Sequence, residues 1–167
     1  MKRLIAAASL LLAIPALVWA QEAEHPYRGQ GYLFFGFGTA SYANPVFEHL
    51  GFGGEGFLYK GLGFGAEAEY VNRGRGTPVW VGSTDFSYHF GRHVARGKLD
   101  PFVVGGFSVV GPTQVGGGRG APAGNFGGGV NWWRAKHAAL RFEAWDVVGS
   151  DFFDTNVLSF RIGVTFR

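Results

Sequence analysis

The sequence predicts an all-β fold: an eight-stranded antiparallel, up-and-down transmembrane β-barrel that is preceded by a cleavable signal peptide. Three observations support this prediction. The chain opens with an apolar export segment. Eight segments of about ten residues follow it, in which apolar and polar residues alternate. Tilted membrane-spanning strands have this length and this period. One face of these segments is aromatic, and the other is made of glycine, small polar and charged residues.

The composition narrows the class of protein further. The 167 residues include 29 Gly and 17 Phe, contain no Cys, and are 47% hydrophobic. The aromatic content excludes disorder, and the missing Cys excludes a disulfide scaffold and a cysteine metal cluster. The glycines do not recur at every third position, which excludes collagen. A single β-rich domain with close backbone approaches fits this composition best.

Residues 1–20 are predicted to be a secretory signal peptide. Lys2 and Arg3 give the segment a positive start, an uncharged apolar stretch follows, and Ala20 offers a small residue at the cleavage position. An uncleaved membrane helix is the weaker alternative, because the apolar stretch is short and Pro15 interrupts it.

After cleavage, residues 21–30 would form a short periplasmic lead and residues 31–167 the barrel. The precursor has 15 basic and 12 acidic residues, and cleavage removes two of the basic ones. The net charge therefore falls from +3 to +1, which gives no argument for a nucleic-acid partner.

The first four predicted strands cover residues 31–40, 49–58, 62–71 and 79–90. Each carries apolar residues at alternate positions, as a strand with one apolar face requires. The residues of the apolar face are Leu33, Phe35, Phe37, Leu50, Phe52, Leu58, Leu62, Phe64, Ala66, Ala68, Tyr70, Trp80, Thr84, Phe86, Tyr88 and Phe90. The opposite face carries Gly36, Gly38, Gly51, Gly53, Glu55, Gly63, Gly65, Glu67, Glu69, Ser83, Asp85, Ser87 and His89. A tight turn at residues 59–61 separates the second strand from the third.

The last four predicted strands cover residues 101–110, 125–133, 138–147 and 156–166. The first of them is apolar on both faces, so its register stays open. In the other three the apolar face carries Phe126, Val130, Trp132, Leu140, Phe142, Ala144, Leu158, Phe160, Ile162, Val164 and Phe166. Their polar face carries Asn125, Gly127, Gly129, Asn131, Arg141, Glu143, Ser159, Arg161, Gly163 and Thr165.

The number and spacing of these strands favour a closed barrel in a membrane. Without water every backbone N–H and C=O must pair between strands, which forces the sheet to close. An even number of strands places both termini on one side, with short periplasmic turns there and longer loops opposite. The connections follow this alternation except at residues 91–100, and residues 111–124 are expected to form the longest loop.

Aromatic residues near the predicted strand ends fit the girdles of a membrane barrel. These residues are Tyr70, Trp80, Tyr88, Phe90, Trp132, Trp133 and Trp145. The alternative is a soluble barrel, such as a lipocalin-like carrier, in which the same aromatics form a core. That alternative leaves the signal peptide and the charged inner face unexplained.

The inner face is expected to hold a buried network of ion pairs. Its members are Glu55, Glu67, Glu69, Asp85, Arg141, Glu143 and Arg161. Either arginine could pair with Glu143, Glu67 or Glu69, and water or His89 would balance the remaining acids. An eight-stranded barrel is just wide enough for its side chains to fill it, so no channel for large solutes is expected.

The inner face contains no convincing catalytic set. Asp85, Ser87 and His89 share a face of one strand, but neighbouring residues on a face stand about 6.5–7 Å apart, too far for direct contact. The histidines are scattered along the chain, so neither a metal site nor any other cofactor is expected.

The chain resembles the small eight-stranded outer-membrane barrels of the OmpA/OmpX type. The motifs that carry the resemblance are Gly53-Gly54-Glu55, the alternation in residues 63–69, Tyr88-His89-Phe90, Pro101-Phe102, residues 127–132, Leu140-Arg141-Phe142-Glu143 and the last strand. The resemblance covers residues 21–167 and implies an outer-membrane location with periplasmic termini.

The resemblance also implies partners and a route of assembly. Phe160, Ile162, Val164 and Phe166 look like the C-terminal signal that the barrel-assembly machinery reads, although Arg167 follows the final aromatic. The implied partners are this machinery, periplasmic chaperones and outer-membrane lipid, and the implied state is a monomer. Similar barrels are plugged or form very narrow pores.

The sequence thus favours a non-enzymatic integral outer-membrane protein that serves envelope structure or surface interaction. A narrow ion pore or small transporter is the first alternative. A barrel-resident hydrolase that modifies lipid A is the second, and would depend on Ser87 and His89.

Overall fold

The computed structural model describes residues 28–40, 46–72, 77–90, 98–113, 119–149 and 157–167. These residues form eight strands: β1 (Gly29–Ala40), β2 (Val46–Tyr59), β3 (Leu62–Asn72), β4 (Val79–His89), β5 (Leu99–Pro112), β6 (Ala121–Trp133), β7 (Ala138–Val148) and β8 (Val157–Phe166). Within these ranges no helix has the length and apolar character needed to cross a membrane. The predicted signal peptide, residues 1–20, lies outside the described residues.

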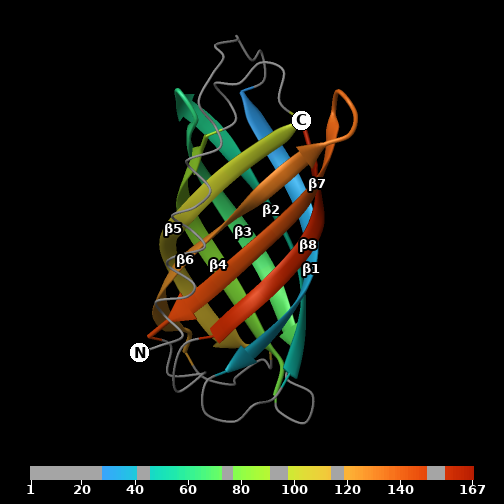
Figure 1. Ribbon diagram of the computed structural model, residues 1–167. Helices are drawn as coiled ribbons and strands as arrows, with labels where there is room; N and C mark the ends of the chain where they lie inside the picture. The colour runs from blue at the N-terminus through green and yellow to red at the C-terminus, as the bar shows by residue number, and fades with distance from the viewer. Residues whose placement is uncertain (1–27, 41–45, 73–76, 91–97, 114–118, 150–156) are drawn as a thin grey trace, which may run out of the picture.

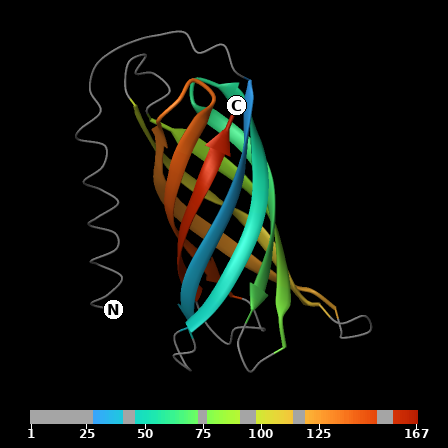
Figure 2. The same cartoon turned by 90° about the vertical axis from the view of Figure 1, so that its right-hand side faces the viewer.

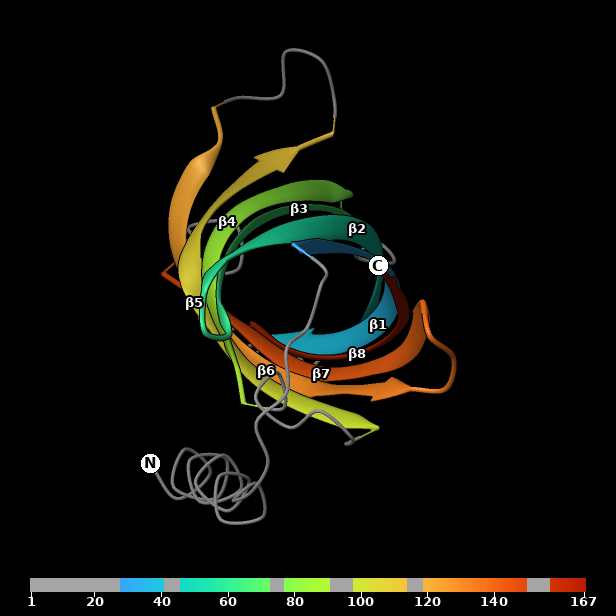
Figure 3. The same ribbon diagram turned by 90° about the horizontal axis from the view of Figure 1, so that it is seen from above.

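The eight strands close into a single antiparallel barrel (Figures 1 and 3). Each strand pairs with its neighbour in sequence, and β1 closes the ring against β8 from Gly31 opposite Phe166 to Ala40 opposite Val157. Closure leaves no strand edge with unpaired backbone groups. The predicted fold class is confirmed.

The start of β1 and the end of β8 lie at the same end of the barrel, which we call the terminus end (Figure 2). The opposite end is called the loop end. The terminus end carries the β2–β3 turn at Lys60 and Gly61, both of which have positive φ (39° and 86°). Two positive φ values in a two-residue loop are those of a type I′ hairpin turn. The predicted tight turn is confirmed.

The strand faces follow the predicted alternation. The apolar residues point outward and stay exposed, including Phe160 (65%), Leu50 (62%) and Phe52 (61%), while the residues between them are buried in the lumen. An exterior covered with exposed aromatic and aliphatic side chains is stable only in a non-aqueous surrounding.

The strand bounds differ from the prediction mainly in β2, β5 and β6, each of which is four residues longer than expected. β5 and β6 pair from Leu99 opposite Trp132 to Val110 opposite Ala121. The prediction of a loop over residues 111–124 was therefore wrong at both ends. The open register of β5 is resolved by pairing, since Phe102 lies opposite the inward-facing His89 and is itself buried.

Two predicted girdle residues face the lumen instead of the membrane. Trp145 is 1% exposed and Trp133 is 9% exposed, whereas Tyr70, Trp80 and Tyr88 point outward. Adjacent residues on a strand face opposite ways, so Trp132 and Trp133 never belong to one girdle. Trp133 and Trp145 were assigned to the girdles because they lie near strand ends, without regard to whether their side chains point outward or into the lumen.

Gly106 of β5 marks a close approach of two strands, and its replacement gives a testable prediction. A Cβ at Gly106 would overlap the carbonyl oxygen of Thr84 and lie 2.6 Å from Asp85 Oδ1. Gly106→Ala is expected to leave most of the protein unfolded, as seen by loss of the fast-migrating unheated band in gel electrophoresis. Gly82→Ala is the control, because its Cβ would meet the Trp80 ring at an ordinary 3.4 Å. Equal folding of both variants would contradict the prediction.

Candidate functional site

The inward-facing side chains fill the lumen in two zones. A polar network runs from the terminus end to the middle of the barrel, and an apolar cluster occupies the loop end. The strands are tilted relative to the axis of the barrel (Figure 1), and residues far apart in sequence meet inside. The lumen is therefore the candidate functional site.

Arg161 on β8 is the centre of the polar network. Its Nη1 lies 2.9 Å from Glu67 Oε1 and 3.7 Å from Glu143 Oε2, and its Nη2 lies 3.0 Å from Glu69 Oε2. The guanidinium also packs 4.4 Å from the Phe34 ring centroid and 4.1 Å from the Trp145 ring. One buried cation thus joins strands β3, β7 and β8 across the lumen.

Arg141 on β7 continues the network toward the terminus end. Its Nε and Nη2 donate to the two carboxylate oxygens of Glu143 at 3.3 and 3.1 Å. The guanidinium lies between the rings of Tyr32 and Phe102, 4.2 and 4.1 Å from their centroids. The Tyr32 hydroxyl donates to Glu67 Oε2 at 3.3 Å, so both arginines share one connected set of acids.

His89 and Glu55 form the terminus-end part of the network. His89 is fully buried, with Nδ1 2.8 Å from Asp100 Oδ2 and Nε2 3.2 Å from both oxygens of Glu55. Gln30 Nε2 donates to Glu55 Oε1 at 2.7 Å, and the Ser87 hydroxyl donates to Glu55 Oε2. Glu55 is therefore held by neutral donors and a histidine, not by an arginine.

The structure brings together six of the seven residues proposed for the network, in two groups, and leaves one apart. Glu67, Glu69, Glu143, Arg141 and Arg161 are connected, and Glu55 joins His89. Asp85 is buried in the lumen wall but forms no ion pair with any described residue.

Two ion-pair partners of the network were missed from the sequence, His49 and Asp100. His49 Nδ1 lies 2.9 Å from Glu69 Oε2, so Glu69 is shared between His49 and Arg161. Both missed residues lie at or just beyond a predicted strand end. Extending the alternation by one or two residues would have placed them on the inward face.

The apolar cluster was also not foreseen, because a glycine-rich and polar lumen was expected along the whole barrel. It contains Phe47, Val71, Val79, Val81, Val110, Ala123, Trp145, Val147 and Val157. Between this cluster and Glu69 lies a cavity of about 10 Å³, also lined by His49 and Ser159. This is about the space that one water molecule requires.

The geometry does not form the serine–histidine pair that the hydrolase alternative needs. The Ser87 hydroxyl and His89 Nε2 both bind Glu55, and no hydrogen bond joins the two residues. Acyl transfer by a serine–histidine pair would need His89 in contact with the hydroxyl, and the group that contacts it is the Glu55 carboxylate. Among the residues with described positions, no three His, Asp or Glu side chains are grouped so as to hold a metal ion.

The residues of the resembled assembly signal form an exposed stripe on the outer face of β8. Phe160, Ile162, Val164 and Phe166 all point outward. Arg167 turns back onto the β6–β7 turn, where its Nε donates to the carbonyl oxygen of Lys136 at 2.9 Å.

Comparison with known proteins shows which solved structures share this fold. The chain matches no protein-family model and no curated protein sequence. It is similar to the N-terminal β-barrel domain of Pseudomonas aeruginosa OprF, with a TM-score of 0.66 and 18% identity over 83% of this chain and 95% of that one. Neisserial surface protein A gives a TM-score of 0.62 and 10% identity, over 83% and 94% of the two chains. OprG of Pseudomonas aeruginosa gives a TM-score of 0.58 and 10% identity, over 87% of this chain and 98% of that one. The chain thus has the fold of the small eight-stranded outer-membrane β-barrels, and its apolar exterior around a filled lumen suits the outer membrane.

Proposed function

We propose that the protein is a non-enzymatic, monomeric integral barrel of the outer membrane, with a closed lumen and a role in envelope structure or surface interaction. One observation carries the proposal: the apolar cluster at the loop end fills the lumen next to the Arg161 network. An apolar constriction resists wetting and blocks ions even where the rest of a lumen is polar.

The proposal includes a route to the membrane. The exposed stripe of Phe160, Ile162, Val164 and Phe166 would be read by the barrel-assembly machinery, after export by residues 1–20 and escort by periplasmic chaperones. A stripe of alternating apolar side chains on the closing strand supports this role, since β8 must be recognised before it pairs with β1.

A narrow ion pore is the second candidate. It is favoured by the ladder of ionisable groups from Asp100 through His89 and Glu55 to the arginines and His49. In that case the apolar cluster would be a gate that opens, not a permanent seal.

Planar-bilayer recording distinguishes the two candidates. The mature protein is refolded in detergent, and a faster-migrating unheated band confirms that the barrel is closed before recording. We expect no steady conductance above that of protein-free membranes. Steady conductance steps, whatever their size, would contradict the closed-lumen proposal and favour the pore.

A lipid assay tests the non-enzymatic part of the proposal. Isolated membranes that contain the wild type, Ser87→Ala or His89→Ala are expected to show the same lipid A composition by mass spectrometry. A lipid change made by the wild type and lost in both folded variants would establish the hydrolase instead.

A further inference from the structure

Six of the seven described lysines and arginines outside the lumen lie at the terminus end of the barrel, and the seventh, Arg119, lies at the loop end. Every lysine after Lys2 lies in a connection at the terminus end: Lys60 between β2 and β3, Lys98 before β5, and Lys136 between β6 and β7. With three arginines at the same end they form a set that we call the basic rim. The basic rim consists of Arg28, Lys60, Lys98, Arg134, Lys136 and Arg167.

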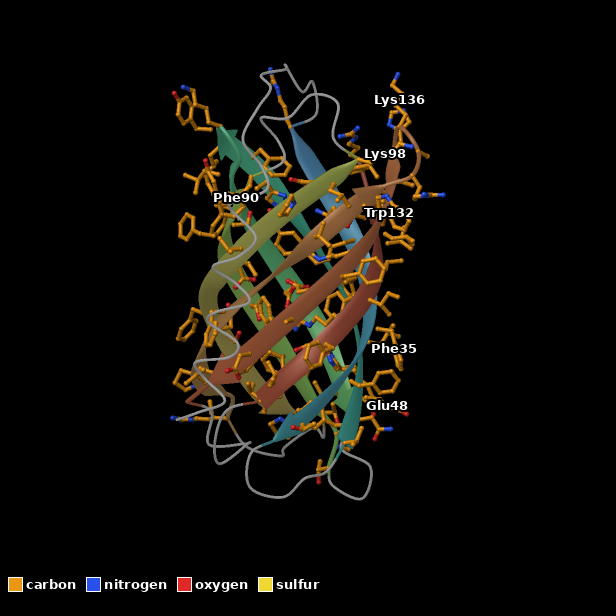
Figure 4. The ribbon with its side chains drawn as sticks, viewed as in Figure 1. Phe35, Glu48, Phe90, Lys98, Trp132 and Lys136 are labelled. Atoms are coloured by element: carbon orange, nitrogen blue, oxygen red, sulfur yellow. The ribbon has the colours of Figure 1, made fainter. Side chains whose placement is uncertain are left out.

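The described residues at the terminus end contain no exposed acid to balance the basic rim. The acids among them, Asp100 and Glu55, are both buried and bound to His89. The described acids outside the lumen, exposed Glu48 and half-buried Asp146, both lie toward the loop end. In Figure 4, Lys98 and Lys136 are at the end of the barrel opposite Glu48.

Aromatic rings place the basic rim at the level of lipid headgroups. The Arg134 guanidinium lies 4.4 Å from the ring centroid of Trp132, and the Lys60 ammonium lies 5.2 Å from that of Tyr59. Tyr and Trp collect at the boundary between hydrocarbon and water, and the long stems of Lys and Arg reach from there to the headgroups.

The turns also hold the basic rim in place. Trp133 N–H donates to the carbonyl oxygen of Lys98 at 2.7 Å, which joins the start of β5 to the end of β6. Arg167 binds the Lys136 carbonyl and packs 4.0 Å from the Trp133 ring centroid. The cations are therefore spaced around the barrel on ordered backbone.

We propose that the basic rim binds the phosphate groups of anionic phospholipids in the periplasm-facing leaflet of the outer membrane. This inference rests on the proposed membrane location with periplasmic termini. Lysine and arginine near a bilayer surface attract anionic headgroups, and arginine binds phosphate through two parallel hydrogen bonds. Because the cations are spread over every connection beside outward-facing aromatics, they match a lipid shell around the barrel better than a polymer that touches one side.

Fluorescence quenching in vesicles tests the proposal. In a Trp80→Phe background, Trp132 is the outward-facing tryptophan of the barrel, and it lies opposite Leu99, next to Lys98. Two sets of vesicles contain phosphatidylcholine and phosphatidylglycerol. The phosphatidylglycerol is brominated in one set and the phosphatidylcholine in the other, and the quenching of Trp132 fluorescence is compared between them. We expect about fivefold or greater preference for phosphatidylglycerol at low salt, and a loss of most of it in 1 M salt.

Matched variants assign the preference to the basic rim. K98Q/K136Q is expected to reduce the preference to less than about twofold. K98R/K136R keeps the charge at that end, and R119Q removes a positive charge at the loop end, so both are expected to behave as the parent. An unchanged preference in K98Q/K136Q, or a loss in R119Q, would overturn the proposal.

Two further outcomes are distinguished by the same samples. Unheated gel mobility reports whether each variant is inserted, so failure of the membrane proposal is separated from failure of lipid binding. If inserted protein shows no lipid preference but sediments with purified cell-wall sacculi, and K98Q/K136Q does not, the basic rim binds cell-wall carboxylates and the lipid proposal is wrong.

Discussion

Replacing Arg161 with methionine is expected to lower the free energy of unfolding by about 3–5 kcal/mol, the usual cost of removing one partner from a buried ion pair. The three carboxylates around Arg161 are affected unequally. Glu69 keeps His49, and Glu143 keeps Arg141. Glu67 keeps only the Tyr32 hydroxyl among its described partners. The measurement is urea-dependent folding into lipid vesicles.

This asymmetry supplies the control for the Arg161 prediction. In the Arg161→Met background, Glu67→Gln is expected to recover more than half of the lost stability, because it neutralises the carboxylate that has lost its cation. Glu55→Gln is expected to recover none, since Glu55 binds His89 and not Arg161. If Arg161→Met costs less than about 1 kcal/mol, or if both second substitutions rescue equally, the network does not stabilise the barrel as described.

The alternation of the strands could be predicted because period two is set by strand geometry alone. Phe35 outward and Gly36 inward follow from the pleat and need no knowledge of the neighbouring strand. Closure followed from the number of strands and the absence of water. These arguments gave the correct face for seven strands and left β5 open, where valine and phenylalanine occupy both faces.

The pairing inside the lumen depends on how far each strand is staggered, which the sequence does not specify. Either arginine could have reached Glu67, Glu69 or Glu143. The stagger brings Arg161 to Glu67 and Glu69, 94 and 92 positions away in the chain, and leaves Arg141 with Glu143. The loop-end cluster was missed for a different reason: its inward valines lie within the predicted strands, near their ends, but only glycine, polar and charged residues were assigned to the inner face.

The loop-end cluster leads to the second large effect, at Trp145. Trp145→Ala is expected to lower the free energy of unfolding by about 3–5 kcal/mol and to give the barrel a steady conductance in planar bilayers. Among the described residues Trp145 is the largest fully buried side chain; it belongs to the apolar cluster and packs against the Arg161 guanidinium. Its removal would join the cavity of about 10 Å³ to the space that the indole leaves. Water entering there would hydrate the Arg161 network from the loop end.

Trp145→Phe separates the loss of volume from the loss of the indole. Phenylalanine keeps an aromatic ring against Arg161 and is expected to cost less than about 1.5 kcal/mol and to stay non-conducting. If Trp145→Ala proves too unstable to record, Phe47→Ala removes a neighbouring member of the cluster and is expected to conduct as well. Variants that fold but remain as silent as the wild type would mean that the charged network, and not the apolar cluster, closes the lumen. The Arg161→Met/Glu67→Gln double variant would then be expected to conduct, because it removes two charged groups from that network and leaves Trp145 and the valines in place.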